Sequence, residues 1–102
     1  VATVPLFSGA IIEVNFQNFF TNGQNPDLGS IVGHELGHLL GLGHSCEFQT
    51  RPNTPNCASS TGDTTITRAL MFPTFALNPS TGIGEVRPSL NSNDQGRVNC
   101  LY

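Results

Sequence analysis

The three histidines of this 102-residue chain all lie between positions 34 and 44, in the stretch GHELGHLLGLGHS. His34 and His38 are four residues apart, so on a helix their side chains lie on the same face. Their imidazoles can then bind one ion at the usual zinc–nitrogen distance of about 2.0–2.1 Å. Glu35 lies about 100° further round such a helix, which lets its carboxylate reach a water on the ion rather than the ion itself. The spacing therefore predicts two metal ligands and a general base on one helix.

Glycines follow the second histidine where a longer helix would otherwise continue. An uninterrupted helix would carry His44 to the side opposite His38. Gly41 can adopt the left-handed conformation that ends a helix without steric cost, and Gly43 loosens the return of the chain. We therefore expect the helix to end at Gly41 and His44 to turn back as the third ligand. Three neutral nitrogens with one open position are typical of a catalytic zinc site.

The composition excludes two classes of partner. Charged residues make up 11% of the chain and the net charge is −3, so no basic face is expected for nucleic acid. No apolar run approaches the roughly 20 residues that a membrane-spanning helix needs. The length is that of a single domain with a modest core.

The three cysteines are Cys46, Cys57 and Cys100. They form no C-x-x-C pair, which excludes a zinc ribbon and a thioredoxin-like redox motif. Low charge together with cysteines that can pair is typical of a secreted, extracellular or periplasmic protein. Because the number is odd, either one thiol is free or one is bonded to a polypeptide outside this sequence.

Two segments before the histidines favour extended structure. Residues 1–5 are expected to end an edge strand, because Pro5 removes a ladder donor. Residues 10–16 (AIIEVNF) are β-branched and aromatic, and alternation puts Ile12, Val14 and Phe16 on one face of a strand. The aromatic residues expected in the core or in strands are Phe16, Phe19 and Phe20.

The helix that carries the histidines is expected to begin at Pro26, with Asn25 as its N-cap. Its apolar residues are Leu28, Ile31, Val32, Leu36, Leu39 and Leu40. Residues 45–68 are polar and rich in turn formers, so we expect a surface loop there. After the apolar stretch ALMFPTF, residues 78–88 form another loop.

The last segment, LNSNDQGRVNCLY, is predicted to be a helix. Asn91 can cap it, and Asp94 three residues later completes a capping box. Apolar side chains of this helix share one stripe, and Cys100 points away from that stripe.

Three motifs in this order resemble a known family. HELGHLLGLGH, from His34 to His44, matches the HExxHxxGxxH signature of the metzincin zinc endopeptidases. Met71 lies in ALMFP, which is similar to the methionine turn of the matrixins, and Ser45 follows the third histidine as it does there. The closing segment from Leu90 to Tyr102 resembles the matrixin carboxy-terminal helix.

The resemblance implies an α+β fold with a small sheet, an active-site helix, an irregular loop-rich lower subdomain and a C-terminal helix. It implies a zinc endopeptidase in which His34, His38 and His44 hold Zn²⁺ above the methionine turn of Met71. Glu35 would take the proton from the zinc-bound water that attacks the peptide bond, and pass it to the leaving amine.

The resemblance also implies where a peptide or protein substrate binds. Residues 1–5 would be the edge strand that pairs with an extended peptide, with residues 10–16 as the neighbouring strand. Pro73, Thr74 and Phe75, just after the methionine turn, would line the pocket for the substrate residue beyond the scissile bond.

The chain departs from the family in two ways. Further strands and a helix are expected before Val1 and are absent, so residues 1–102 are interpreted as one matrixin-like catalytic domain lacking its N-terminal part. An N-terminal fragment would then be associated or disulfide-linked; an unusually minimal domain is the alternative. The stretch between His44 and Met71 is also longer than in matrixins, and a Cys46–Cys57 disulfide could close it. A Cys57–Cys100 disulfide is equally compatible with the sequence.

Two other functions are compatible with the same residues. The first is a non-catalytic zinc-binding remnant or interaction module derived from a processed metallopeptidase. The second is a metal-buffering protein, which would not need a methionine turn.

Overall fold

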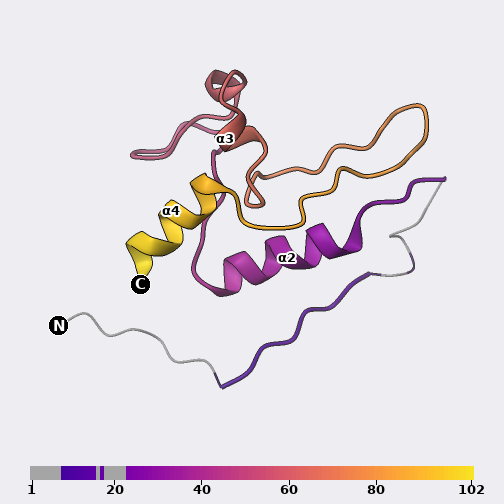
Figure 1. Cartoon of the computed structure of the whole chain (residues 1–102), viewed down its shortest axis with the longest axis horizontal. Coiled ribbons are helices and arrows are strands. Elements are labelled where there is room, and N and C mark those ends of the chain that lie inside the picture. Colours follow the sequence, from indigo (N-terminus) through magenta and orange to yellow (C-terminus); the bar gives the residue numbers. More distant parts are fainter. Residues whose placement is uncertain (1–7, 16, 18–22) are drawn as a thin grey trace.

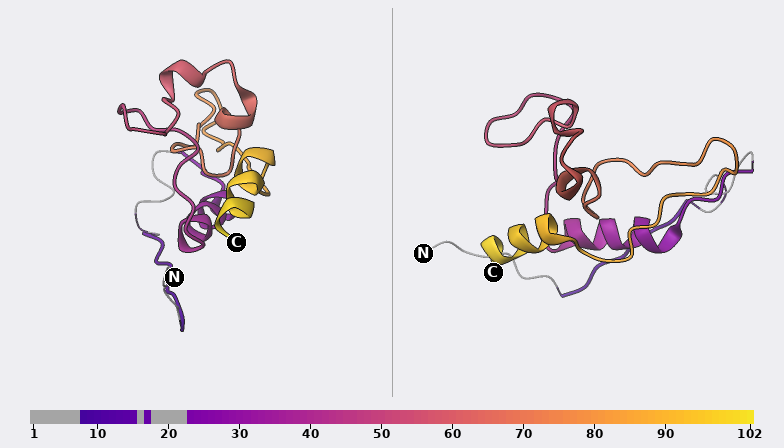
Figure 2. Two further views of the ribbon diagram at one scale, coloured as in Figure 1. Left: turned by 90° about the vertical axis from the view of Figure 1, so that its left-hand side faces the viewer. Right: turned by 45° about the horizontal axis from the view of Figure 1, so that its top comes forward.

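The computed structural model describes residues 8–15, 17 and 23–102 (Figure 1). The described part contains helices α2 (Leu28–Leu39), α3 (Thr64–Thr67) and α4 (Ser92–Leu101), and the 3-10 helix η1 (Ala58–Ser60). Both views in Figure 2 place α4 beside the C-terminal end of α2. The Tyr102 hydroxyl donates to the Leu40 carbonyl at 2.7 Å, which links the end of α4 to the C-cap of α2.

Helix α2 begins two residues later than the sequence predicts. Asp27, not Asn25, is the N-cap, and its carboxylate accepts from the Ser30 N–H at 2.9 Å and from the Ser30 hydroxyl at 2.6 Å. Asn25 is not available as a cap because its backbone is bonded to Gly82 and Gly84. The N-cap prediction was therefore wrong, although the chemistry of the cap is the expected one.

The end of α2 confirms the predicted turn. Leu40 is the C-cap, and Gly41 follows with φ 94°, the left-handed region that favours glycine. The Gly41 N–H donates to the His38 carbonyl and the Leu42 N–H to the Gly37 carbonyl. The helix therefore ends one residue after the second histidine, and the chain reverses its direction at Gly41.

No paired strand is found among the described residues. Residues 10–15 run exposed beside α2, and Ile11 is 88% exposed. The expected strand over residues 10–16 is therefore wrong for its described part, since a strand needs a neighbour that supplies ladder hydrogen bonds. Its expected neighbour at residues 1–5 lies outside the described residues, as do Phe16, Phe19 and Phe20. The sheet of the expected α+β fold remains a prediction.

The core lies where α2, α4 and residues 69–71 meet. Its apolar members are Leu42, Cys46, Cys57, Ala69, Leu70 and Met71. Gly33 and Gly37 let α2 approach this core closely, because their missing Cβ atoms face Leu70 and Met71. Met71 and Asp94 are fully buried.

Residues 45–68 are more ordered than a plain surface loop. Cys46 and Cys57 form a disulfide, with an isolated bridge between Glu47 and Asn56 beside it. This confirms one of the two pairings compatible with the sequence, excludes Cys57–Cys100, and leaves Cys100 free and exposed. Helices η1 and α3 follow within the segment, so the expectation of a loop without regular structure was wrong there. Asp63 caps α3 by accepting from the Thr65 N–H.

The C-terminal helix confirms its predicted cap. The Asn91 side chain accepts from the N–H groups of Asn93 and Asp94, and the Asp94 carboxylate accepts from the Asn91 N–H. Between α3 and α4 the chain makes a long excursion (Figure 1), closed by a bridge between Leu77 and Gly84 and docked on Asn25 through Ile83. None of the described helices is long and apolar enough to cross a membrane.

Candidate metal centre

Three histidines converge at the C-terminal part of α2 and the turn that follows it. Each of His34, His38 and His44 offers a ring nitrogen, and these atoms lie within 4.8 Å of one another. The ring centroids are 4.8 Å (His34–His38), 4.9 Å (His38–His44) and 5.3 Å (His34–His44) apart. The three side chains are therefore placed so that they could bind one metal ion.

Backbone carbonyls hold the outer nitrogens of the two helical histidines. Nδ1 of His34 lies 2.7 Å from the Leu70 carbonyl, and Nδ1 of His38 lies 2.8 Å from the Leu42 carbonyl. A carbonyl only accepts, so each Nδ1 carries a hydrogen, and in the neutral ring the lone pair is then on Nε2. This is the arrangement that metal-ligating histidines usually show.

The third histidine faces a carboxylate instead. Nδ1 of His44 lies 3.4 Å from Oε1 of Glu47, the residue after Cys46 in the disulfide loop. On the backbone side, Arg97 of α4 donates to the carbonyls of Gly43 at 2.7 Å and His44 at 3.2 Å. The position of His44 therefore depends on two segments that lie after it in the sequence.

The environment favours the neutral form of the most buried ligand. Burial lowers the pKa of the His34 imidazole, and charge on His38 or His44 would lower it further; the Leu70 carbonyl acts in the opposite direction. Only the neutral ring offers a lone pair to a metal. The lowered pKa therefore favours the neutral form of His34, although the nearby Glu35 carboxylate acts against it, as the Leu70 carbonyl does.

Asp94 holds the turn that lies against the histidine helix. Its buried carboxylate accepts from the N–H groups of Leu70 at 2.8 Å and Met71 at 3.2 Å, and pairs with Arg97 at 3.3 Å. The Leu70 carbonyl in turn fixes His34, and the Met71 carbonyl accepts from the Ser45 N–H, next to His44. The Met71 side chain packs against α2 at Gly37.

Glu35 is exposed on the same helix. It lines a groove of about 640 Å³ with His38, between α2 and residues 10–15. Its carboxylate is therefore open to solvent on a surface that also includes one of the three histidines.

In the segment after Met71, the side chain that lies next to a histidine is that of Phe75. The Phe75 ring lies 5.6 Å from the His34 ring in an edge-on arrangement. Pro73 is half-buried and Thr74 exposed. Of the three residues predicted to line a pocket, Phe75 is the one that contacts a histidine.

The donor set fits a transition metal, because three imidazole nitrogens with held Nδ1 atoms are typical ligands. Comparisons with protein-family models, curated proteins and solved structures found no match. The case for a metal centre therefore rests on the geometry of the chain itself.

Sequence reasoning missed two residues that support the site. Glu47 lies three residues after the predicted ligand His44, and Arg97 lies three residues after the predicted capping residue Asp94. For Arg97 this spacing on a predicted helix is a usable signal. For Glu47 the pairing depends on the tertiary fold of the disulfide loop.

Proposed function

We propose that this chain belongs to a matrixin-like metzincin catalytic domain and is a zinc-dependent endopeptidase. The observation that carries the proposal is the convergence of the three histidine nitrogens within 4.8 Å. The held Nδ1 atoms of His34 and His38 support it, because they leave the inner nitrogens free to bind.

Zinc is the proposed ion, since three histidines with an open position are a common catalytic zinc set. When bound, zinc would supply a Lewis acid that lowers the pKa of water and polarises a peptide carbonyl. The contribution of the chain would be to favour the neutral form of His34 and to orient the rings of His34 and His38 through their carbonyl partners.

Glu35 is the proposed general base. Its exposed carboxylate follows His34 directly on α2 and faces solvent beside His38. It would accept the proton of the attacking water and donate it to the leaving amine. Phe75, in contact with the His34 ring, would form one wall of the site for the substrate residue after the scissile bond.

The test compares Glu35→Gln with wild type for zinc content and for hydrolysis of casein. Because Gln keeps the shape of Glu35 but cannot take a proton, we expect full zinc content and a loss of hydrolysis of at least about 100-fold. Asp63→Asn, an exposed cap position, is the matched control and should cleave normally. A Glu35→Gln protein that binds zinc and cleaves like wild type would contradict the role of Glu35.

A second candidate is a zinc-binding module that interacts with another polypeptide without catalysis. It is favoured by exposed leucines on α2 and at its C-cap: Leu28 is 38%, Leu36 45% and the C-cap Leu40 46% exposed. Such apolar surface is commonly covered by a partner. A wild-type chain that holds one zinc and cleaves no protein substrate would favour this candidate.

The Cys46–Cys57 disulfide is compatible with an extracellular location. We propose secretion on that basis. Detection of the oxidised protein outside cells would test it.

A further inference from the structure

Arg87 is a buried arginine outside the residues singled out by the sequence. Its side chain is 4% exposed, and the residue lies on the irregular segment that leads into α4. Nε and Nη2 pair with the Glu85 carboxylate at 3.1 and 2.8 Å. A charged side chain is rarely this buried without such pairing, so the ion pair neutralises Arg87 inside the fold.

The remaining donors of Arg87 bind the segment after Met71. Nη1 donates to the Phe72 carbonyl at 3.2 Å, and Nη2 donates to the Thr74 carbonyl at 2.7 Å. These two carbonyls flank Pro73, which has no N–H of its own to anchor the segment. The guanidinium therefore fixes the path of residues 72–74.

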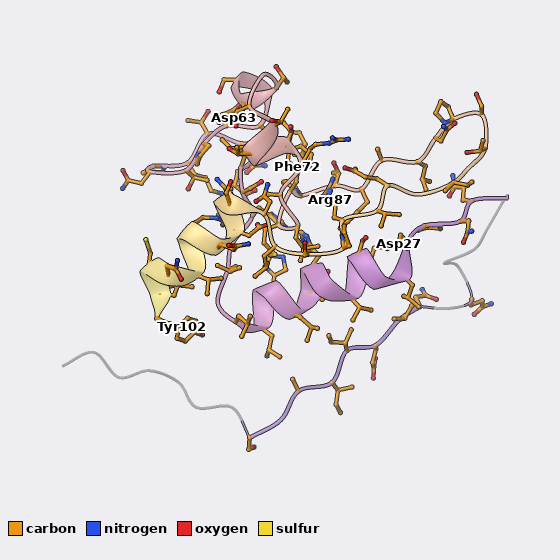
Figure 3. The ribbon with its side chains drawn as sticks, viewed as in Figure 1. Asp27, Asp63, Phe72, Arg87 and Tyr102 are labelled. Atoms are coloured by element: carbon orange, nitrogen blue, oxygen red, sulfur yellow. A yellow bond between two sulfur atoms is a disulfide. The ribbon has the colours of Figure 1, made fainter. Side chains whose placement is uncertain are left out.

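The same guanidinium covers the ring of Phe75. Its central carbon lies 4.3 Å from the Phe75 centroid and 5.4 Å from that of Phe72, both within cation–π range. Figure 3 shows Arg87 beside Phe72, above α2. Since the Phe75 ring also meets His34 edge-on at 5.6 Å, it lies between a fixed cation and a metal-ligand histidine.

The backbone of Arg87 is tied to the start of the histidine helix. Its N–H donates to the buried Ser30 hydroxyl at 2.7 Å, which in turn donates to the Asp27 N-cap at 2.6 Å. Arg87 thus links two parts of the fold: its side chain bonds the Phe72–Phe75 segment, and its backbone bonds α2. Movement of that segment relative to His34 would break these bonds.

We infer that Arg87 is a positioning residue that determines substrate preference by holding Phe75 against His34. The inference rests on the proposed peptidase function. Phe75 lies between the guanidinium and the His34 ring, and under the proposed function it would form one wall for the substrate residue after the scissile bond. Loss of Arg87 should therefore weaken the preference that this wall imposes on the side chain immediately after the scissile bond.

The test measures kcat/KM for peptides that differ only in that residue, Leu, Ala or Glu, using zinc-loaded protein. The main variant is the double substitution Glu85→Gln/Arg87→Met, which removes the donors without leaving Glu85 as an unpaired charge. We expect its zinc content to stay at wild-type level while the Leu-to-Ala preference falls at least about tenfold. Arg87→Lys keeps the charge but not the fork of donors, so it should recover part of the preference.

Arg51→Met is the matched control, because Arg51 is exposed in the disulfide loop; it should keep the wild-type preference. If the double variant does not fold, Arg87→Lys carries the comparison, and an unchanged Leu-to-Ala ratio in that variant overturns the inference. The same result in a folded double variant also overturns it. A zinc-loaded wild type that cleaves no peptide overturns the proposed function and the inference together, whereas equal selectivity in an active variant overturns the inference alone.

Discussion

Gly37 of α2 and Met71 are in direct contact, and the Met71 side chain fills the space into which a Cβ at position 37 would project. The contact joins the C-terminal turn of the histidine helix to the residues whose carbonyls accept from His34 and Ser45. Any side chain at position 37 must therefore displace the turn, the helix or both.

Gly37→Ala is expected to lower the free energy of unfolding by about 1–3 kcal/mol, the usual range for overpacking a core. It should also weaken metal binding, because a shift of residues 70 and 71 moves the acceptor that fixes His34. Urea unfolding and a metal titration measure the two effects. Gly96→Ala, where nothing lies within 4 Å of the added methyl group, should be neutral or stabilising; equal effects at both positions would contradict the packing argument.

Asp94→Asn should destabilise the protein by about 3 kcal/mol. The carboxylate is fully buried, accepts two backbone N–H groups of the turn, and pairs with Arg97. An amide accepts through only one atom, so it leaves at least one donor or the arginine without its partner. Asp63→Asn makes the same chemical change at an exposed cap and should cost little by denaturant unfolding.

Removing the disulfide with Cys46→Ala/Cys57→Ala should cost about 2–4 kcal/mol, the typical range for a crosslink. It should also lower metal affinity, because Glu47, which faces His44, lies within the loop. Cys100→Ser provides the control, since that thiol is free and exposed. Unfolding midpoints that do not differ between the two proteins would show that the loop is held by its other contacts.

The N-cap of α2 predicts a change of stability in acid. Hydrogen bonds from the Ser30 hydroxyl and N–H lower the pKa of Asp27 below its ordinary value of 3.8. Because the folded state favours the carboxylate, this contribution is complete above that value and is lost as the pH falls through the lower folded-state pKa.

Asp27→Asn keeps an acceptor at the cap but has no such titration. Wild type should therefore be more stable than Asp27→Asn at neutral pH, and the difference should disappear in strong acid. Asp27→Ala should lose about 1 kcal/mol at neutral pH, the usual cost of a missing cap. Urea unfolding across the pH range gives the free energy of unfolding of all three proteins. A stability difference between wild type and Asp27→Asn that grows toward acid would contradict the role of the Asp27 carboxylate as the N-cap.

Local signals made part of the site predictable from the sequence. The spacing of His34 and His38, the left-handed Gly41 and the capping box of α4 each depend on residues close together in the chain. Such signals survive in the folded protein because the distant partners add to the local bonds rather than replace them: Asp94 accepts from Leu70 and Met71 and still caps α4.

Other features depend on contacts between distant residues. Asn25 is a residue type that often caps a helix, but its backbone N–H and carbonyl are hydrogen-bonded to Gly82 and Gly84. Asp27 is the N-cap instead. Arg87 meets Ser30 across 57 positions, and no pattern near Arg87 indicates this. The strand expected over residues 10–16 is not formed by its described part, residues 10–15, and its expected neighbour lies outside the described residues.

The carbonyl that orients His34 belongs to Leu70, 36 positions away. In an unfolded chain that acceptor is gone, and the rings of His34, His38 and His44 no longer face a common point. An ion held by the three rings is therefore a ligand of the native state alone, and its binding free energy adds to the free energy of unfolding by mass action. Metal concentration and thermal stability become linked variables: a chelator should lower the melting temperature, and each tenfold rise in free metal above the dissociation constant should restore about 1.4 kcal/mol.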